Sequence, residues 1–294
     1  MQIEKANETG FCFGVRRALN FLNEAIHEHG DVETLGHMVH NQKVIDTFSS
    51  RGVKIVKNID QIKGNVVVIP SHGVPPIVKE QLNTRGLKII DATCPIVRKA
   101  QMAAKELSDR GFEVIIFGDP AHSEVKGVLG WVGDGMATLD SAVASQFNKP
   151  PSRLGFLSQT TQNPTNFLQF VGGFISSILP QINELCIINT ICHVTRRRQS
   201  EGLELANRVD LMIVVGGRNS ANTLRLAEIC SSTGVETHHI EEAAEIEEGW
   251  LKGRSSVGIT AGTSTLDDVT QEVVLKLERV KKELKCRVKN SEYT

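Results

Sequence analysis

Three similar cysteine-containing segments constrain the fold of this chain more than any other feature of its sequence. They read ANETGFCFGVRRA (6–18), IIDATCPIVRKA (89–100) and IINTICHVTRRR (187–198). Each has a Thr shortly before the Cys, and each continues as Cys-x-x-(Val/Thr)-Arg-(Arg/Lys). The cysteines at positions 12, 94 and 192 are separated by 82 and 98 residues. This recurrence predicts a triplicated structural unit, with chance similarity as the alternative.

Short apolar runs alternate with segments of helical periodicity. Val66–Pro70 and Leu211–Val215 are such runs, and Asn163 with Pro164 forms a helix-start signal. Continuous apolar strands alternating with helices are typical of buried parallel sheets. We therefore expect an α/β fold of three similar lobes, with mostly parallel sheets, around a pseudo-threefold axis. The expected lobes are 13–94, 95–192 and 193–286, the last completed by 1–12, with a C-terminal tail at 287–294.

The composition excludes several classes of protein. Forty per cent of the 294 residues are apolar, and 33 Lys and Arg against 34 Asp and Glu give a net charge of −1. The apolar content excludes disorder as the main state, and the lack of a basic excess argues against general nucleic-acid binding. No apolar run approaches the roughly 18 residues of a membrane span, and the charged N-terminal segment does not read as a signal peptide. We expect a cytoplasmic enzyme that is not bound to a membrane.

The three repeated cysteines are candidate metal ligands. Ligands of open parallel sheets bind beyond the carboxyl ends of the strands, so equivalent cysteines of three lobes would meet near a common axis. Three thiolates with one open position suit an iron–sulfur cluster or zinc. No Cys-x-x-Cys pair is present, so a metal site must come from distant segments. The other cysteines are expected to be buried or incidental: Cys186, Cys230 and Cys286.

Polar residues in strand-end loops suggest an anion pocket and a proton donor. Hydroxyl and amide groups at helix starts favour phosphate binding, although any one of them could simply cap a helix. Glu124, two residues beyond His122, could deliver a proton if burial raises its pKa, and Thr160 or Thr161 could relay it. The candidate anion-binding side chains are His40, His72, His122, Ser220, Asn222 and Ser264.

A set of short motifs, in a fixed order from about Gly10 to Asp268, resembles the family of (E)-4-hydroxy-3-methylbut-2-enyl diphosphate reductases, the last enzymes of the non-mevalonate isoprenoid pathway. Each motif alone is weak, but the ordered set is specific. The motifs are GFCFGVRRA, VHN, SHGV, DATCP, HSEVKG, SQTT, NTIC, NSAN and AGTS.

The resemblance implies three α/β lobes around a central 4Fe-4S cluster with three Cys ligands, which match Cys12, Cys94 and Cys192. It implies that the open iron binds the allylic hydroxyl, that Glu124 supplies protons and that Thr160 hydrogen-bonds near the hydroxyl. Two electrons and two protons would remove this hydroxyl as water, leaving isopentenyl and dimethylallyl diphosphate. The residues implied to hold the diphosphate are His40, His72, His122, Ser220, Asn222 and Ser264.

The chain departs from the family pattern in the diphosphate loops. Ala221 stands where the family often has Ser, so it could contact phosphate only through its backbone N–H. Thr263 and Leu266 replace the Ala and Pro that are more common around Ser264. The resemblance also suggests ferredoxin or flavodoxin as electron donor. Both are acidic, and the candidate docking residues are Arg196, Arg197 and Arg198 of a chain expected to act as a monomer.

Three other functions compete with the reductase. A non-redox hydro-lyase could use the same open iron for dehydration of a phosphorylated substrate, without consuming reductant. An iron–sulfur sensor or scaffold would not need the phosphate-binding residues. A zinc protein could use the same three thiolates, and would be colourless rather than brown.

Overall fold

The computed structural model describes residues 1–147 and 150–291, whose strands form three four-stranded sheets with only parallel pairings among the described residues. The strand order is the same in all three: the second strand of the lobe, then the first, third and fourth. The prediction of three similar α/β lobes is therefore confirmed. The chain divides into two compact units, the first holding 1–12, 40–42 and 194–294 and the second holding 13–39 and 43–193. The residue boundaries expected for the lobes stay a prediction.

The first sheet lies in the second unit and has the order β3-β2-β4-β5. The apolar run of β4 is buried along its whole length, as expected for a strand of a parallel sheet that is covered on both faces, and Val67 and Ile69 pack in one core cluster. The strands are β2 (Glu33–Leu35), β3 (Lys54–Val56), β4 (Val66–Ile69) and β5 (Lys88–Asp91). The helices are α1 (Phe13–His29), α2 (Gln42–Ser50) and α3 (Pro76–Thr84), with a 3-10 turn at Ile59–Gln61.

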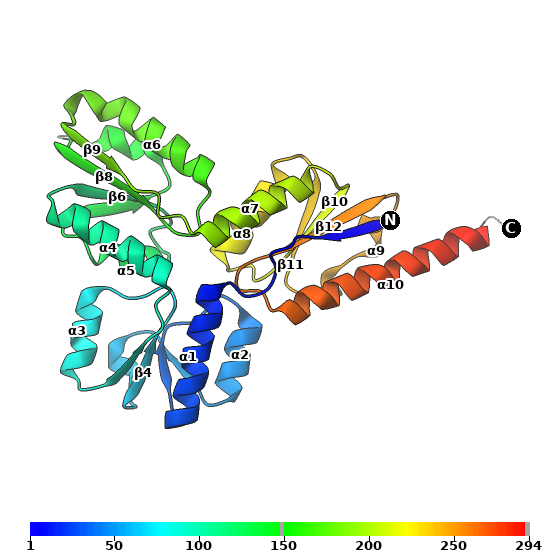
Figure 1. The fold of residues 1–294 in the computed structure, drawn as a ribbon, viewed down its shortest axis with the longest axis horizontal. Coiled ribbons are helices and arrows are strands. Elements are labelled where there is room, and N and C mark those ends of the chain that lie inside the picture. The colour runs from blue at the N-terminus through cyan, green and yellow to red at the C-terminus, as the bar shows by residue number, and fades with distance from the viewer. Residues whose placement is uncertain (148–149, 292–294) are drawn as a thin grey trace. The chain divides into compact units, whose positions relative to one another are not determined.

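The second sheet, also in the second unit, has the order β7-β6-β8-β9. Figure 1 shows α6 on one face of it and α4 with α5 on the other. The expected helix start is confirmed, since Asn163 Oδ1 accepts from the N–H groups of Thr165 and Asn166. The strands are β6 (Glu113–Phe117), β7 (Gly135–Thr138), β8 (Arg153–Ser158) and β9 (Glu184–Ile187). The helices are α4 (Pro95–Asp109), α5 (Ser123–Leu129) and α6 (Pro164–Ile178), with 3-10 turns at Ser141–Gln146 and Leu179–Gln181.

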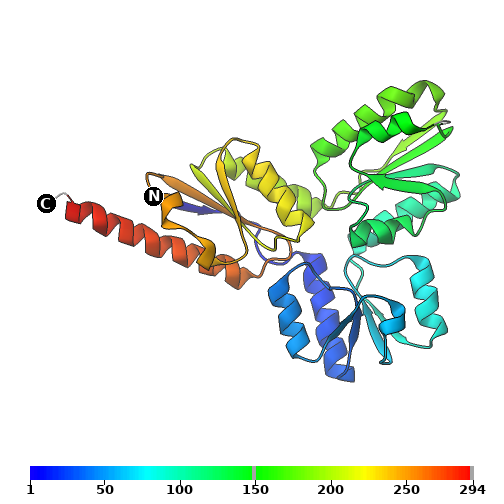
Figure 2. The ribbon, with the colours of Figure 1, turned by 180° about the vertical axis from the view of Figure 1, so that it is seen from behind.

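The third sheet belongs to the first unit and has the order β11-β10-β12-β1, so the N-terminal strand supplies its fourth member. Alternate residues of β10 face opposite sides: Ile213 packs with α10, and Met212 packs with α7 and α8. Figure 2 shows helices on both faces of this sheet. The strands are β1 (Gln2–Lys5), β10 (Leu211–Val215), β11 (Glu236–Ile240) and β12 (Ser256–Ala261). The helices are α7 (His193–Ala206), α8 (Ala221–Ser231), α9 (Glu248–Leu251) and α10 (Asp267–Ser291), with a 3-10 turn at Ala243–Glu245.

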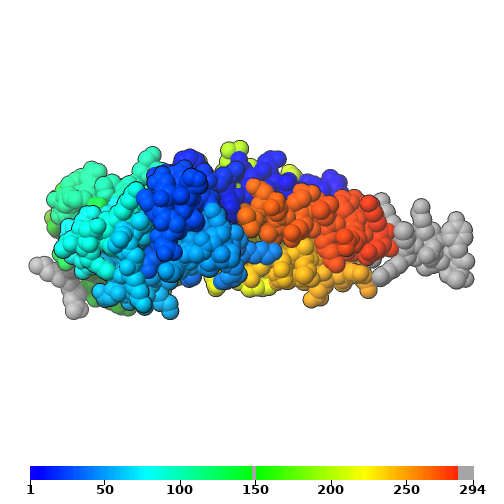
Figure 3. Space-filling view, turned by 90° about the horizontal axis from the view of Figure 1, so that it is seen from below, coloured from blue at the N-terminus to red at the C-terminus, as the bar shows by residue number. Residues whose placement is uncertain are grey.

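Helix α10 packs one apolar stripe on the third sheet and exposes its other side. Val273 and Leu277 are fully buried, whereas Leu275 is exposed. The described part of α10 is seen at the orange-to-red end of the surface in Figure 3. The first residues of the expected C-terminal tail continue this helix to Ser291, and 292–294 and the side chain of Cys286 lie outside the described residues. In the described part of the chain, no helix combines the length and apolar character that a bilayer crossing requires.

Candidate functional site

The three repeated cysteines occupy equivalent positions, each between the fourth strand of its sheet and the helix that follows. Cys12 lies between β1 and α1, Cys94 between β5 and α4, and Cys192 between β9 and α7. Their main-chain N–H groups donate to carbonyls of the neighbouring strand-end loop at 3.0, 2.8 and 2.9 Å. In each case the acceptor is the second residue beyond the third strand. The acceptors are Thr263 for Cys12, Ser71 for Cys94 and Thr160 for Cys192.

These cysteines differ from the others in their surroundings. Cys12, Cys94 and Cys192 are half-buried and outside any disulfide. Cys230 is fully buried in the core of the first unit, and burial raises the pKa of its thiol to about 12. Cys186 packs against a core cluster from β9. Among the described side chains, no three His, Cys, Asp or Glu are grouped closely enough to hold one metal ion.

A buried acid lies beside the Cys192 loop in the second unit. Glu124 is 4 % exposed, and burial raises the pKa of its carboxyl. Its Oε1 accepts from the Thr160 N–H at 2.7 Å and its Oε2 accepts from the Thr160 hydroxyl at 2.8 Å. The carbonyl of the same Thr160 accepts from Cys192. Because Asn163 caps α6, Thr160 is not needed as the helix start, and its hydroxyl is used by Glu124.

Two of the predicted histidines, His122 and His72, lie in the same unit, and their hydrogen bonds favour different tautomers. His122 Nδ1 accepts from the Glu124 N–H at 3.2 Å, so the neutral ring carries its proton on Nε2 and can donate from there. His72 Nδ1 lies 3.0 Å from the carbonyl of Gly73, so this nitrogen is the protonated one. Nε2 of His72 then accepts when the ring is neutral and donates when it is charged. Helix α5 packs closely against the His72 loop, since a Cβ at Gly127 would lie 3.3 Å from the His72 carbonyl.

The remaining predicted anion-binding residues lie in the first unit. The Asn41 side chain donates to the carbonyl of Ser264 at 2.7 Å, which holds the His40 segment on the loop after β12. The loop after β10 lies against the same segment, because a Cβ at Gly217 would lie 2.8 Å from the His40 carbonyl. The first unit therefore gathers His40, both strand-end loops and, through Thr263, Cys12.

Two of the loop side chains keep unused hydrogen-bonding groups. Asn222 and Ser264 are 5 % and 6 % exposed, and among the described residues Asn222 Nδ2 and Ser264 Oγ have no hydrogen-bond partner. Buried polar groups are normally paired, so these atoms indicate a place for a polar ligand. Ser220 caps α8 by accepting from the Thr223 N–H at 3.4 Å, and Ala221 is the first helical residue. The N–H groups of this first turn point toward the N-terminal end of α8.

The structure corrects one expectation about the basic residues after Cys192. Arg198 is 2 % exposed and donates to three main-chain carbonyls, so it is not a surface docking residue. Its neighbour Arg197 is exposed and pairs with Glu8 and Glu201. Arg196 is also exposed. The helical period turns the third arginine of the run inward, which the count of basic residues does not reveal.

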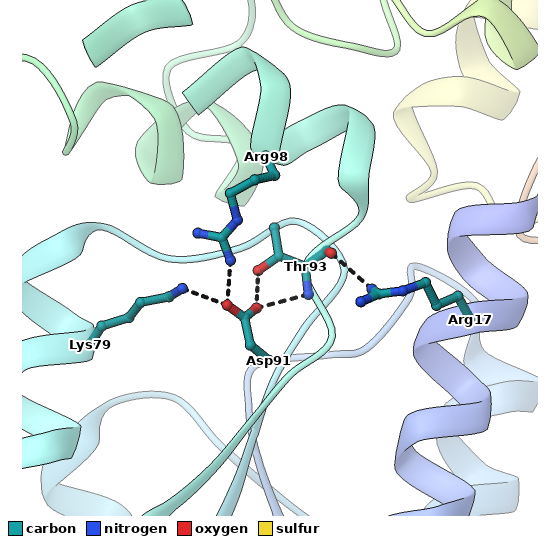
Figure 4. Close-up of polar contacts among 5 residues, drawn as sticks. All are labelled: Arg17, Lys79, Asp91, Thr93 and Arg98. Carbon is teal, nitrogen blue, oxygen red and sulfur yellow. Dashed lines mark hydrogen bonds and ion pairs between the residues drawn. The ribbon is translucent and has the colours of Figure 1, made fainter. Parts of the chain in front are cut away.

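The sequence analysis also missed Asp91, which fixes the Cys94 loop. Asp91 lies three residues before Cys94 and accepts from Lys79 of α3, from Arg98 of α4 and from both the N–H and the hydroxyl of Thr93 (Figure 4). Desolvation by itself would raise the pKa of the Asp91 carboxyl. The hydrogen bonds from Lys79 and Thr93 and the charge of Lys79 outweigh this effect and lower the pKa from 3.8 to about 2. The Asp within DATC was the available signal, because an Asp before a turn commonly accepts from the N–H two residues ahead.

Arg17 extends this network from helix α1, which begins directly after Cys12. Its guanidinium donates to the carbonyl of Thr93 at 3.0 Å (Figure 4). A basic residue downstream of one cysteine thus contacts the loop of the next. Arg198 does the same in the third repeat: it follows Cys192 in the sequence and donates to the Gly10 carbonyl in the Cys12 loop.

Comparisons with known proteins agree on one family. A family model described as LytB protein matches residues 3–278. A protein of Dehalococcoides mccartyi strain CBDB1, named 4-hydroxy-3-methylbut-2-enyl diphosphate reductase, is 50 % identical over 281 residues, which cover 95 % of this chain and 99 % of the relative. A protein of the same name from Pelobacter propionicus is 39 % identical over 284 residues, covering 96 % of this chain and 99 % of that one.

Solved structures give the same result for the fold. A structure of (E)-4-hydroxy-3-methyl-but-2-enyl diphosphate reductase, described as the terminal enzyme of the non-mevalonate pathway, is similar with a TM-score of 0.70 at 37 % identity. It covers 95 % of this chain and is itself covered completely. A Plasmodium falciparum structure has a TM-score of 0.87 at 24 % identity, covering 93 % of this chain and 86 % of that one, and supports the fold.

Proposed function

The chain belongs to the LytB protein family, and on this premise we propose that it reduces (E)-4-hydroxy-3-methylbut-2-enyl diphosphate to isopentenyl and dimethylallyl diphosphate. The allylic C–O bond breaks, two electrons and two protons enter, and the hydroxyl leaves as water. The observation that carries this proposal is the buried Glu124–Thr160 pair, which is joined to the Cys192 loop through the Thr160 carbonyl.

The proposed cofactor is a 4Fe-4S cluster with Cys12, Cys94 and Cys192 as ligands. The donor set fits, because the three thiols are outside disulfides and their main chains make equivalent hydrogen bonds in the three lobes. Soft thiolates favour iron–sulfur clusters, and each cysteine of a cluster binds its own iron, so the three sulfurs need not meet at one point. When bound, the cluster would supply single electrons and an open iron that acts as Lewis acid toward the hydroxyl.

Glu124 is the proposed proton donor. Its raised pKa keeps the carboxyl protonated to higher pH than that of an exposed glutamic acid, and a hydroxyl leaves much more readily as water. Thr160 holds both carboxyl oxygens in place and is positioned to orient the leaving hydroxyl. The hydrogen bonds of the Glu124 carboxyl and its burial therefore both support proton delivery by this residue.

The diphosphate is proposed to bind the strand-end loops by charge-assisted hydrogen bonds. His122 donates from Nε2 as a neutral ring, and His72 donates from Nε2 once protonated. Asn222 and Ser264 offer the buried donors that have no partner among the described residues. Binding at this end would fix the allylic end of the substrate and lower the entropic part of the barrier. The remaining proposed contacts are the side chains of His40 and Ser220 and the N–H of Ala221.

The electron donor is proposed to be ferredoxin or flavodoxin, which would dock on exposed basic residues. Arg196 and Arg197 remain candidates after Arg198 is removed from this surface. Turnover with the donor protein should fall steeply with added salt, whereas turnover with a small artificial reductant should not. Because one chain supplies all three cysteines, we propose that a monomer is sufficient for activity.

The reductase is distinguished from the hydro-lyase by its need for electrons. Anaerobically purified protein would be mixed with substrate, with and without dithionite-reduced viologen, and the products separated. We expect isopentenyl and dimethylallyl diphosphate only with reductant. Full conversion without reductant would replace the reductase with the hydro-lyase. A Glu124→Gln sample run in parallel tests whether the same pair is required.

A further inference from the structure

Arg198 of α7 is a buried cation held by main-chain carbonyls rather than by a carboxylate hydrogen bond. Its Nη1 donates to Ala261 and Gly262 at 2.9 Å each, and its Nη2 donates to Gly10 at 2.6 Å. The side chain is 2 % exposed. Burying a charge is costly unless all of its donors are paired, and Arg198 Nε has no hydrogen-bond partner among the described residues, so this arrangement requires a reason beyond packing.

The carbonyls that Arg198 binds belong to two loops of the first unit. Gly10 lies two residues before Cys12, and Gly262 lies next to Thr263, whose carbonyl accepts from the Cys12 N–H at 3.0 Å. Arg198 therefore joins the loop of the cysteine to the loop that leads to Ser264. If either loop moved, the guanidinium would lose hydrogen bonds that water cannot replace in the buried site.

The Cys12 loop is further restricted at Gly10. Gly10 has a φ of 75°, and a Cβ there would lie 1.9 Å from the Asp267 carboxylate, so neither the backbone nor the space suits another residue. The loop is thus closed from both sides, by Asp267 of α10 at Gly10 and by Arg198 of α7 at the Gly10 carbonyl.

Arg198 occupies a position at which the three repeats differ in residue type. The sixth residue beyond the cysteine is Ala18 in the first repeat and Ala100 in the second, and both are buried small residues. Only the third repeat places a cation there. Burial lowers the pKa of the Arg198 guanidinium, and the largest effect in the opposite direction comes from Cys12. The 2.6 Å hydrogen bond from Arg198 to the Gly10 carbonyl, two residues before Cys12, places this charge beside the cysteine loop.

We propose that Arg198 is a positioning residue that holds Cys12 in its ligand geometry and makes the bound cluster easier to reduce. A fixed positive charge close to a thiolate ligand stabilises the more negative, reduced state of a cluster, which raises the reduction potential. The electron comes from the ferredoxin or flavodoxin of the proposed function, on which this inference rests.

The test uses Arg198→Gln, Arg198→Lys and the matched control Arg197→Gln, all in the full chain purified anaerobically. Two readouts are measured without turnover: the midpoint potential by spectroscopic redox titration, and the rate of iron release to a chelator. Arg197 carries the same charge one residue away, in exposed ion pairs that contribute little.

Arg198→Gln is expected to lower the midpoint potential by about 59 mV, which is a tenfold change in the ratio of oxidised to reduced cluster for one electron. Arg198→Lys, which keeps the charge but loses the forked donor, should keep the potential and release iron faster than the wild type. The control should change neither quantity. Equal potentials in Arg198→Gln and wild type, or equal shifts in Arg198→Gln and Arg197→Gln, would overturn the role of the charge.

The positioning role has its own deciding result. If Arg198→Gln does not fold, Arg198→Lys decides, and an iron-release rate identical to that of the wild type would overturn the inference. A wild-type protein without iron and sulfide would instead remove the proposed cofactor. The two failures are therefore distinguishable in the same set of samples.

Discussion

The loops of Cys12 and Cys94 are equivalent in the internal repeat, and an arginine donates to a main-chain carbonyl in each, but the Cys94 loop is also held by the carboxylate of Asp91. The Cys94 loop is fixed by Asp91, an anion paired with Lys79 and Arg98. The Cys12 loop is fixed by Arg198, a buried cation on main-chain carbonyls. The hydrogen bond from each cysteine N–H to the neighbouring strand-end loop is a second feature that both share.

This difference shows that the repeat keeps the position of the cysteine while each lobe uses its own contacts to fix the loop. Asp91 is partly exposed and has cationic partners within reach, so its contribution must depend on pH and salt. Arg198 is buried and stays charged at every pH of interest, so its contribution depends on the carbonyls around it. Perturbing one loop should therefore affect quantities that the other does not.

The largest effect is expected from the cysteines themselves. Cys12→Ser and Cys94→Ser should each reduce turnover by more than about 100-fold and release iron, since even groups behind a metal ligand are worth 10–100-fold. Cys192→Ser should behave in the same way. The control is Cys230→Ser, a buried cysteine in the core, which should keep its iron. Iron retention in Cys12→Ser alone would break the equivalence of the two loops.

Glu124→Gln removes the proposed proton donor and leaves both cysteine loops intact. We expect kcat to fall by about 10²–10⁴-fold with iron content unchanged, because the amide keeps the shape but cannot supply the proton. In the wild type, the raised pKa predicts that turnover is retained above the usual glutamate range and falls as pH rises through the folded-state value. Glu113→Gln, another carboxyl whose pKa is raised by burial, is the control. Iron loss in Glu124→Gln would make Glu124 structural.

Asp91→Asn tests the ionic anchor of the Cys94 loop. A pKa lowered from 3.8 to about 2 means that the folded state favours the carboxylate, so this stability is present above pH 3.8 and is lost as pH falls toward 2. After allowance for solvent screening, the variant should lose about 1–2 kcal/mol of unfolding free energy at pH 7, and this loss should shrink toward zero as the pH falls through about 2. Denaturant unfolding at several pH values measures this.

Asp109→Asn is the matched comparison for Asp91. Its carboxylate forms an exposed pair with Lys105 on the same helix turn, and such pairs contribute only about 0.3–0.5 kcal/mol. A loss at pH 7 equal to that of Asp91→Asn would show that the Cys94 loop needs no special anchor.

The smallest effect is expected at Ser264, beside the carbonyl that holds Cys12. Ser264→Ala should leave the unfolding free energy within about 0.5 kcal/mol, because the hydroxyl has no partner among the described residues. It should weaken inorganic pyrophosphate binding by about 5–10-fold, the value of one hydrogen bond. Calorimetric titration measures the affinity. Unchanged affinity would remove this hydroxyl from the proposed diphosphate site.

Much of the fold was predictable from local patterns. The three-lobed α/β architecture followed from the repeated cysteine segments and from runs such as Val66–Pro70, because buried parallel strands are continuously apolar. The raised pKa of Glu124 was predicted conditionally, and the structure supplies the burial that causes it. Both predictions came from the local sequence and from the spacing of the repeated segments, without knowledge of long-range contacts.

What the sequence did not reveal depends on tertiary contacts. Arg198 was expected on a basic surface, because a run of three arginines does not tell which one the helix turns inward. Asp91 and Asn41 were missed, since their partners Lys79, Arg98 and Ser264 are defined only after the strands have paired. The cysteine-to-carbonyl hydrogen bonds were equally out of reach, because main-chain partners leave no mark in the sequence.

The central claim is that Cys12, Cys94 and Cys192 hold one iron–sulfur cluster. Iron and acid-labile sulfide analysis of anaerobically purified wild-type protein, with electron paramagnetic resonance of the reduced sample, tests it most directly. The account predicts a brown protein with iron and sulfide in equal amounts, about four of each per chain, and a reduced-cluster signal. A colourless protein carrying one zinc per chain, with no sulfide, would contradict it.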